Sequence, residues 1–184
     1  MAPNKKQKKE SSKEQTDKWV FCKEIMDSNP IKKRHPSCYM PIKIILKEEG
    51  CKEKSPFERQ KALNLDKIEV KLAKEEKRNQ RSTVDLAIGI AGRKKGGDKK
   101  IRLVECKFDV KRFHRKLIED LRDKNKQTRD YYSFGYPIQE SFVVLLNEDF
   151  FQQGLRFIKN GFSDSPYCEV MTVKEFYSQY FEPY

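Results

Sequence analysis

The stretch STVDLAIGIA, residues 82–91, is followed by the loop GRKKGGDKK, residues 92–100, and then by IRLVECKFDV, residues 101–110. The first and third stretches are rich in apolar and β-branched residues, which favour β-strands. The loop between them is charged and contains the glycines that turns often use. We therefore predict a β-hairpin over residues 82–110.

Two opposite charges lie inside the second predicted strand. Because side chains alternate between the two faces of a strand, Glu105 and Lys107 share one face, and Val104, Cys106 and Phe108 point to the other. Charges are rarely placed in a strand with apolar flanks unless they are paired. This pair therefore marks one face of the hairpin as a candidate site.

The first strand contributes a matching charge, Asp85. A hairpin centred on Lys95 places Asp85 directly across from Glu105, and a hairpin centred on Gly96 places it across from Lys107. In either register the three charged side chains lie on one face at one end of the hairpin. The face of the first strand opposite to Asp85 is expected to carry Val84, Leu86, Ile88 and Ile90.

Two carboxylates directly opposite each other destabilise a sheet unless a cation lies between them. A divalent metal bound by Asp85 and Glu105 would be that cation, and hard oxygen ligands completed by water are what Mg²⁺ prefers. Lys107, beside the metal, would hold or help to deprotonate an attacking water, or would neutralise charge on a phosphorus transition state.

The elements around the hairpin alternate between helices and strands. Residues 55–79 are predicted to form a helix with Ser55 as N-cap, Pro56 at its first position and Glu58 in a capping box. An amphipathic helix with a basic outer face is expected over 111–132. Further along, we expect a strand (140–147), a helix (148–161), a strand (167–173) and a terminal helix (174–181). This order predicts an α/β domain with a mixed sheet covered by helices on both faces.

The N-terminal third is expected to be organised differently. Residues 1–15 are Lys-, Glu- and Ser-rich and predict a flexible basic tail. Residues 16–54 are expected to form a helix from Thr16 to Asn29 and an irregular extension. Within this extension PIKIIL, residues 41–46, fits either a strand or a helical turn. Residues 55–184 would then form the α/β domain.

The composition narrows the range of partners. The chain has 184 residues, 40 Lys and Arg against 28 Asp and Glu, and a net charge of +12. Such an excess attracts polyphosphates, which makes nucleic acid the first candidate partner. No stretch is apolar enough for a membrane helix, and five irregularly spaced cysteines favour a reducing, cytoplasmic or nuclear location.

The pattern VD in one strand followed by ECK in the next resembles the PD-(D/E)xK nuclease superfamily, which includes restriction endonucleases and Holliday-junction resolvases. The resemblance covers roughly residues 55–147. It implies a restriction-endonuclease-like core and a Mg²⁺- or Mn²⁺-dependent nuclease that hydrolyses phosphodiester bonds in DNA. It also implies that Asp85, Glu105 and the backbone carbonyl of Cys106 bind metal and that Lys107 is the catalytic lysine.

The resemblance further implies an acidic residue on the helix before the hairpin. Glu58 matches that position, as a catalytic and metal-binding residue, and Glu69 or the pair Glu75 and Glu76 are alternatives. The chain departs from the family pattern at Val84, where the family name has Pro. The family's downstream Gln or Lys on the second helix matches either Gln127 or Lys124.

Basic residues near the hairpin are expected to hold the DNA backbone. The candidates flank the predicted metal site: Arg81, Lys111, Arg112, Arg115 and Lys116. An alternative function is a catalytically inactive nuclease fold that binds nucleic acid or acts as an assembly subunit. Expected partners are therefore DNA and, in either case, other protein subunits or a second copy of the chain, but no membrane.

Overall fold

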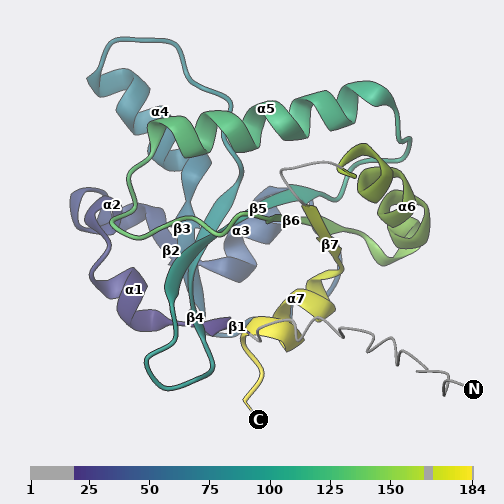
Figure 1. Cartoon of the computed structure of the whole chain (residues 1–184). Coiled ribbons are helices and arrows are strands. Elements are labelled where there is room, and N and C mark those ends of the chain that lie inside the picture. Colours follow the sequence, from purple (N-terminus) through teal and green to yellow (C-terminus); the bar gives the residue numbers. More distant parts are fainter. Residues whose placement is uncertain (1–18, 164–167, 184) are drawn as a thin grey trace, which may run out of the picture.

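The computed structural model describes residues 19–163 and 168–183, so the expected tail (1–15) and the start of the expected N-terminal helix lie outside the described residues. Within the described residues, seven strands form one mixed β-sheet with helices on both faces (Figure 1). The strand order is β2-β3-β4-β5-β6-β7, and β1 pairs with β4. The predicted α/β class with a covered mixed sheet is confirmed.

The strands and helices alternate along the second half of the chain. The strands are β1 (Trp19–Phe21), β2 (Tyr39–Pro41), β3 (Lys61–Asn64), β4 (Leu86–Gly92), β5 (Lys99–Lys107), β6 (Phe142–Leu146) and β7 (Cys168–Met171). The α-helices are α1 (Lys23–Asp27), α2 (Pro30–Arg34), α3 (Ile42–Glu48), α4 (Leu65–Glu75), α5 (Arg115–Tyr131), α6 (Phe151–Gly161) and α7 (Val173–Tyr180). Two short 3₁₀ helices are η1 (Pro36–Cys38) and η2 (Glu148–Phe150).

The predicted hairpin is present as β4 and β5. Leu86 pairs with Val104 and Ala87 with Leu103, which is the register of a hairpin centred on Lys95. The alternative register centred on Gly96 is wrong. β5 also pairs in parallel with β6, and β6 pairs in parallel with β7. β5 is thus the strand at which the sheet changes from antiparallel to parallel pairing, with α5 and α6 as the crossovers that parallel strands require.

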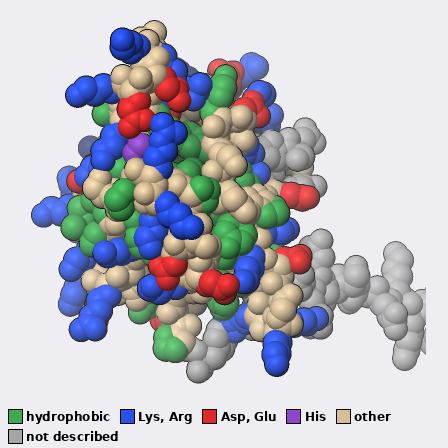
Figure 2. Space-filling view, turned by 90° about the vertical axis from the view of Figure 1, so that its left-hand side faces the viewer, with side chains coloured by type: hydrophobic (Ala, Val, Ile, Leu, Met, Phe, Trp, Pro, Cys, Tyr) green, Lys and Arg blue, Asp and Glu red, His purple; other side chains and the backbone are tan. Residues whose placement is uncertain are grey.

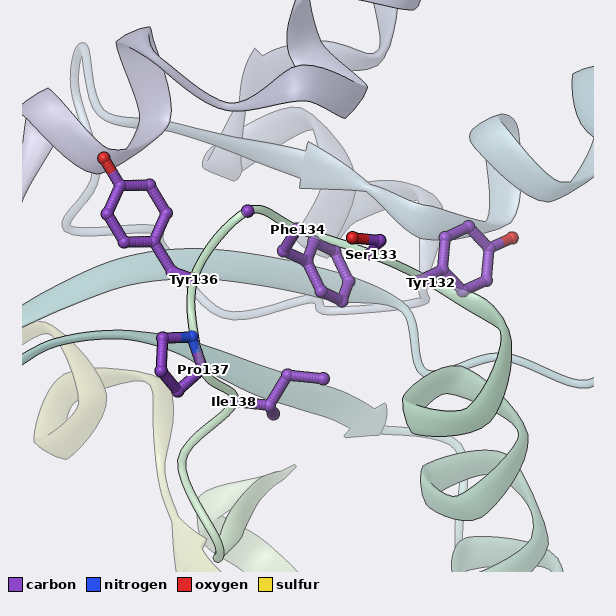
Figure 3. Close-up of a pocket in the computed structure, with 7 residues that line it drawn as sticks. Tyr132, Ser133, Phe134, Tyr136, Pro137 and Ile138 are labelled. Carbon is purple, nitrogen blue, oxygen red and sulfur yellow. The ribbon is translucent and has the colours of Figure 1, made fainter.

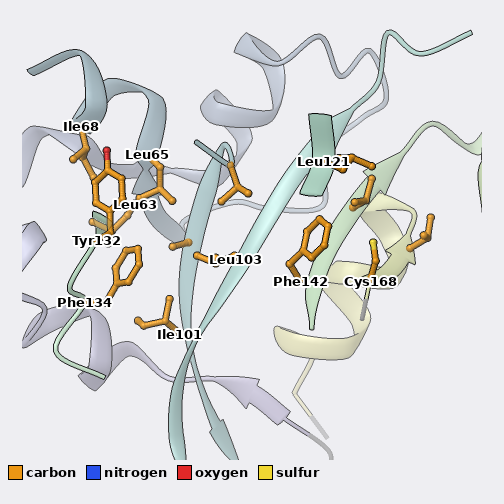
Figure 4. Packing of buried hydrophobic residues seen from close by; sticks show 14 of the residues in the cluster. Leu63, Leu65, Ile68, Ile101, Leu103, Leu121, Tyr132, Phe134, Phe142 and Cys168 are labelled. Carbon is orange, nitrogen blue, oxygen red and sulfur yellow. The ribbon is translucent and has the colours of Figure 1, made fainter. Parts of the chain in front are cut away.

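Two layers of buried side chains cover the two faces of the sheet. On one face, apolar residues of α1, α4, α5 and α6 pack against Ile101 and Leu103 of β5. Figure 4 shows Ile68, Leu121 and Phe142, from three different elements, lying in this layer. On the other face α3 and α7 pack against Val104 and its neighbours. Because odd-numbered residues of β5 face α5, Glu105 and Lys107 point toward that helix.

The helix predicted over 55–79 begins ten residues later, at Leu65. The Ser55 hydroxyl accepts from the N–H of Phe57 but starts no helix, and residues 61–64 form β3 instead. Asn64 is the actual N-cap, and its side chain accepts a 3.0 Å hydrogen bond from the N–H of Lys67. The capping-box pattern was misleading because pairing of β3 with β4 and β2 provides more hydrogen bonds than an isolated cap.

The N-terminal region is also more regular than expected. β1 and β2 join the sheet, and α3 contributes Ile42, Ile45 and Leu46 to the core. PIKIIL is therefore helical, as one of the two alternatives had it. The helix expected over Thr16–Asn29 is instead β1 followed by the short α1, because residues 19–21 pair with the end of β4.

The strand alternation does not extend to Val84. This residue precedes β4 and packs with the α5 side of the core, rather than with Leu86 and Ile88 on the other side. Similarly, α5 begins at Arg115, so Lys111 and Arg112 lie in the connection after β5.

Among the described residues, no helix has both the length and the apolar character needed to cross a membrane.

Candidate active site

Four carboxylates gather at the end of the sheet where β4 begins and β5 ends. Asp85 directly precedes β4, and Glu105 lies near the end of β5. Glu49 follows α3, and Asp66 lies in the first turn of α4. One carboxylate oxygen from each of Glu49, Asp66 and Asp85 lies within 4.8 Å of the other two. Both Asp85 and Glu105 are buried, at 2% and 0% exposure.

Asp85 is held by contacts on both sides. The N–H of Cys106 donates a 2.5 Å hydrogen bond to Asp85 Oδ2, and the N–H of Leu65 donates to the Asp85 carbonyl at 2.9 Å. The preceding residue, Val84, donates its N–H to Thr128 Oγ1 of α5 at 3.0 Å. A strand, a helix start and the C-terminal turn of α5 therefore fix the position of this carboxylate.

Glu105 is contacted by two lysines through one oxygen. The ammonium groups of Lys107 and Lys124 each lie 2.7 Å from Glu105 Oε1. Lys124 Nζ also lies 4.0 Å from Asp85 Oδ1, so this residue of α5 faces both acids. The second oxygen, Glu105 Oε2, is buried and has no hydrogen-bond partner within the part of the chain that the structure describes. A buried carboxylate oxygen without a partner carries a desolvation cost that a bound cation would remove.

Glu49 is positioned by the way α3 ends. The N–H of Gly50 donates to Lys47 O at 3.1 Å, and the N–H of Cys51 donates to Leu46 O at 2.9 Å. This pair of hydrogen bonds is a Schellman motif, in which the residue after the C-cap adopts a left-handed conformation. Gly50 has φ +91°, which glycine adopts without strain. Glu49, as the C-cap, is thereby aimed toward the other acids.

Asp66 is positioned by the change from β3 to α4. Asn64 caps the helix, so Asp66 falls in its first turn, where the helix dipole favours a negative charge. The hydroxyl of Thr83 donates to Asp66 Oδ1 at 3.2 Å. Since β3 pairs with β4, the start of α4 lies beside Asp85.

The close approach of these acids alters their protonation. Burial, with the charges of Glu105 and Glu49, raises the pKa of Asp85 from 3.8 to about 9. Burial and the nearby Asp66 and Glu105 raise the pKa of Glu49 from 4.5 to about 7. Burial also raises the pKa of Asp66, although Lys124 opposes this effect. Burial and the repulsion between the carboxylates therefore outweigh the effect of the nearby lysine, and a divalent cation would favour the ionised carboxylates.

Burial disfavours the charged form of Lys124, but Glu105 and Asp85 outweigh this effect and raise the pKa of its ammonium group. Lys124 was one of two candidates for the downstream residue. The other, Gln127, accepts the N–H of Ser82 at 3.1 Å and donates to Asp123, so it anchors the segment before Asp85 instead.

The structure brings Asp85, Glu105 and Lys107 together as the sequence predicted, but it does not bring Glu58 to them. Glu58 is exposed in a bend before β3, and its prediction as a helical acid is wrong because no helix forms there. The alternative Glu69 is buried, but it binds Arg78 and the backbone N–H of Arg81 and accepts from Tyr132. Glu75 and Glu76 pair with arginines at the other end of α4.

Sequence reasoning did not select Glu49 or Asp66, although each carries a local signal. Glu49 precedes Gly50 at the end of an apolar helical turn, a pattern typical of helix ends. Asp66 follows Asn64 by two residues, and Asn before an amphipathic run is typical of helix starts. The early start assigned to the helix at Ser55 hid the signal at Asp66, and PIKIIL, which fitted either a strand or a helical turn, left the helix end at Glu49 unassigned.

Cys106 contributes its backbone to the site and not its thiol. Its side chain lies in the apolar layer on the far face of the sheet, and burial raises the pKa of the thiol well above the usual value. Its N–H points to Asp85. Because the N–H and C=O of a strand residue face the same neighbouring strand, the Cys106 carbonyl is also directed toward the β4 side.

The predicted DNA-contacting residues differ in exposure. Lys111, Arg112, Arg115 and Lys116 are exposed around the start of α5. Arg81 is half-buried, and its guanidinium lies 3.8 Å from the centre of the Tyr131 ring. Lys and Arg side chains are also spread over the face that carries α1, α2 and α4 (Figure 2). The basic surface is thus broad.

A hollow of about 410 Å³ is formed by the loop after α5, residues 132–138. Figure 3 shows the hydroxyl of Tyr136 pointing toward the neighbouring helical region, where it is 2.7 Å from the hydroxyl of Ser28. The described residues that line this hollow are apolar, small or aromatic, and they include no carboxylate, imidazole or amine.

Comparisons of this chain with protein-family models, with curated proteins and with solved structures find no match.

Proposed function

We propose that this protein is a metal-dependent nuclease that hydrolyses phosphodiester bonds in DNA, built on a restriction-endonuclease-like core. The observation that carries the proposal is the arrangement at the end of the hairpin. Asp85, which directly precedes β4, and Glu105, near the end of β5, are both buried, and Lys107 and Lys124 both contact Glu105 Oε1. A buried acid pair with adjacent lysines suits charge stabilisation at a phosphate better than a structural role.

The donor set fits a hard divalent cation such as Mg²⁺ or Mn²⁺. Among the described residues Glu105 Oε2, which is buried, has no hydrogen-bond partner, and burial, with the charges of Glu105 and Glu49, raises the pKa of Asp85. Asp85, Glu105 and the Cys106 carbonyl would hold one ion, and Glu49 and Asp66 would share a second position with Asp85. When bound, such ions act as Lewis acids toward phosphate and lower the pKa of water.

The lysines have roles that follow from their placement. Lys107 has a partly exposed side chain, and its ammonium group lies beside Glu105, where it can hold a water molecule or a phosphate oxygen. Lys124 faces both Asp85 and Glu105 from α5, so it keeps the carboxylates close together before a metal binds. Lys124 is therefore a positioning residue in this proposal, and Lys107 is the catalytic one.

DNA is the proposed substrate because the chain as a whole is strongly basic, with a net charge of +12. Exposed Lys and Arg residues lie where the connection after β5 leads into α5, close in sequence to Lys107. Such groups contact phosphates on either side of a scissile bond without reading base sequence. The free cysteines Cys22, Cys38, Cys51, Cys106 and Cys168 suit a reducing compartment such as the cytoplasm or nucleus.

The test is cleavage of supercoiled, linear, single-stranded and branched DNA, with RNA alongside, in Mg²⁺, Mn²⁺ or EDTA. Wild type is compared with Glu105→Gln and Lys107→Ala, and Glu58→Gln is the matched control for loss of a carboxylate. We expect metal-dependent cleavage of DNA that falls at least about 100-fold in the first two variants, with DNA binding retained. Wild type that binds DNA without cutting it would instead support a binding or assembly subunit.

A further inference from the structure

A groove of about 500 Å³ lies between α6 and the connection that follows β5. It is lined by Phe113, Gln152, Gln153, Arg156, Phe157 and Asn160. The rings of Phe113 and Phe157 are 5.9 Å apart and form its apolar part. The two glutamines, the arginine and the asparagine are exposed. Within residues 19–163 and 168–183, the structure gives these four side chains no hydrogen bond or ion pair.

One wall of the groove, α6, packs closely on its neighbours. A Cβ at Gly154 would lie 2.7 Å from Phe113 Cζ, and a Cβ at Gly161 would lie 2.7 Å from Ile118 Cγ1 of α5. These two glycines, seven residues apart, lie on one face of α6 and allow close packing. Gln153, Arg156 and Asn160 are spaced three and four residues apart, so they form a single outward stripe.

The groove lies at the same end of the sheet as the proposed active site. Lys107 pairs with Leu146 in the parallel β5–β6 ladder, so the chain leaves β6 beside the catalytic lysine and reaches α6 shortly afterward. Figure 1 shows α6 beside the N-terminal end of α5. Phe113 itself lies within the basic run KRFHRK, residues 111–116. The basic side chains of residues 111–116 therefore border the groove on one side, and the amide side chains of α6 border it on the other.

We propose that duplex DNA beside the cut site binds across this groove, so that the outward stripe of α6 enters the major groove and Gln153, Arg156 and Asn160 contact base edges. The chemistry favours this occupant, because Gln and Asn pair with adenine and Arg pairs with guanine. Seven helical residues span about 10 Å, which corresponds to about three base-pair steps. This inference rests on the proposed DNA substrate and adds a preference for particular bases near the cut.

The experiment selects bound sequences from duplex DNA with a randomised central segment, in EDTA, so that binding is measured without cleavage. Wild type should enrich particular bases at neighbouring positions. We expect Gln153→Ala, Arg156→Ala and Asn160→Ala each to lower the preference at one position by about tenfold. Matched controls are Gln179→Ala on α7 and Lys74→Ala on α4, which remove exposed side chains of similar type elsewhere and should leave the pattern unchanged.

The inference would be overturned if the DNA bound by wild type had a random sequence. It would also be overturned if all three groove variants kept the wild-type sequence preference. Sequencing the ends of DNA cleaved in Mg²⁺ separates this failure from failure of the proposed nuclease activity. If the protein cleaves DNA but neither the cut ends nor the bound DNA show a sequence preference, the nuclease activity is supported and base recognition is excluded. Sequence-selective binding without any cleavage would support base recognition at the groove and would contradict the proposed nuclease activity.

Discussion

The backbone N–H of Cys106 donates a 2.5 Å hydrogen bond to Oδ2 of Asp85 across the end of the hairpin. Asp85 precedes β4, so this bond continues the strand pairing through a side chain. It leaves Asp85 Oδ1 on the side of Lys124, at 4.0 Å. The carboxylate is therefore oriented by the fold before any cation is present, which is the condition for a preorganised metal site.

The pKa of Asp85 predicts how the stability of the metal-free protein depends on pH. Burial and the neighbouring acids raise this pKa from 3.8 to about 9, so the native state retains a proton that the unfolded state releases above about pH 4. The stabilising effect is full below that pH and is lost as pH rises toward 9. We expect the melting temperature in EDTA to fall from pH 5 to pH 9.

The variant Asp85→Asn removes this titration and keeps an oxygen that accepts from Cys106. We expect it to exceed wild type in stability at pH 8 by at least about 1 kcal/mol, or roughly 3 °C for a domain of this size. The measurement is thermal unfolding followed by circular dichroism in EDTA from pH 5 to pH 9. Parallel curves for the two proteins would show that Asp85 ionises normally in the metal-free state.

Metal binding should depend on Glu49 and Asp66 and not on Glu58. Glu49→Gln and Asp66→Asn each remove a carboxylate from the cluster, so we expect affinity for Mn²⁺ to fall about tenfold or more in each. Glu58→Gln removes an exposed carboxylate in a bend and should bind as wild type does. Isothermal titration calorimetry at pH 8 measures all four proteins. Equal affinities would exclude Glu49 and Asp66 as ligands.

Mn²⁺ affinity of the wild type should also rise from pH 6 to pH 9. Glu49 has a pKa of about 7 and Asp85 one of about 9, and both protons must leave before the oxygens can bind a cation. Titrations in buffers of different ionisation enthalpy measure the protons released on binding. Affinity that does not change with pH would mean that these two acids stay outside the metal site.

Lys124 should act on catalysis through Glu105 and Asp85. We expect Lys124→Ala to lower kcat/KM for DNA cleavage by about 100-fold and to shift the pH profile, because the acids lose a neighbouring positive charge. Lys126→Ala is the matched control, since Lys126 lies two residues along α5 and pairs with Asp130 on the surface. Partial recovery in Lys124→Arg would confirm a role for the charge. Activity unchanged in Lys124→Ala would exclude such a role.

Replacing Gly50 by alanine should lower the stability of the protein more than the same change at Gly96, another glycine with positive φ. Gly50 and Gly96 have φ +91° and +77°, so alanine at either costs about 1 kcal/mol of conformational strain. At Gly50 a Cβ would also lie 2.8 Å from Asp109 Oδ1, whereas at Gly96 no described residue beyond the two chain neighbours lies within 4 Å. We expect Gly50→Ala to destabilise by about 1 kcal/mol more than Gly96→Ala and to weaken Mn²⁺ binding through Glu49.

Urea unfolding of both glycine variants, followed by fluorescence, tests this difference. Equal losses would mean that Asp109 moves away without cost. Mn²⁺ titration of the folded Gly50→Ala variant tests the second part, because the Schellman motif that Gly50 closes also orients Glu49. Normal Mn²⁺ affinity in that variant would show that Glu49 reaches the cluster without this helix end.

The hairpin and its three charges were predictable because they depend on local geometry. Alternation along a strand placed Glu105 and Lys107 on one face, and the register centred on Lys95 brought Asp85 to the same end. The helical acid was not predictable in the same way. The Ser55 capping pattern competed with pairing of β3, and the sheet contacts prevailed. Local propensity is overridden where a segment finds partners elsewhere in the chain.

The sequence by itself determined the α/β class, the β4–β5 hairpin and the common face of Asp85, Glu105 and Lys107, because a two-residue period and turn residues act over short distances. Only the tertiary structure decided that Glu49 and Asp66 meet these acids and that Lys124 faces them. Glu49 and Asp66 stand at the end of one helix and the start of another, and Lys124 lies along a third. Where those positions meet depends on how the helices pack against the sheet, which no short sequence pattern encodes.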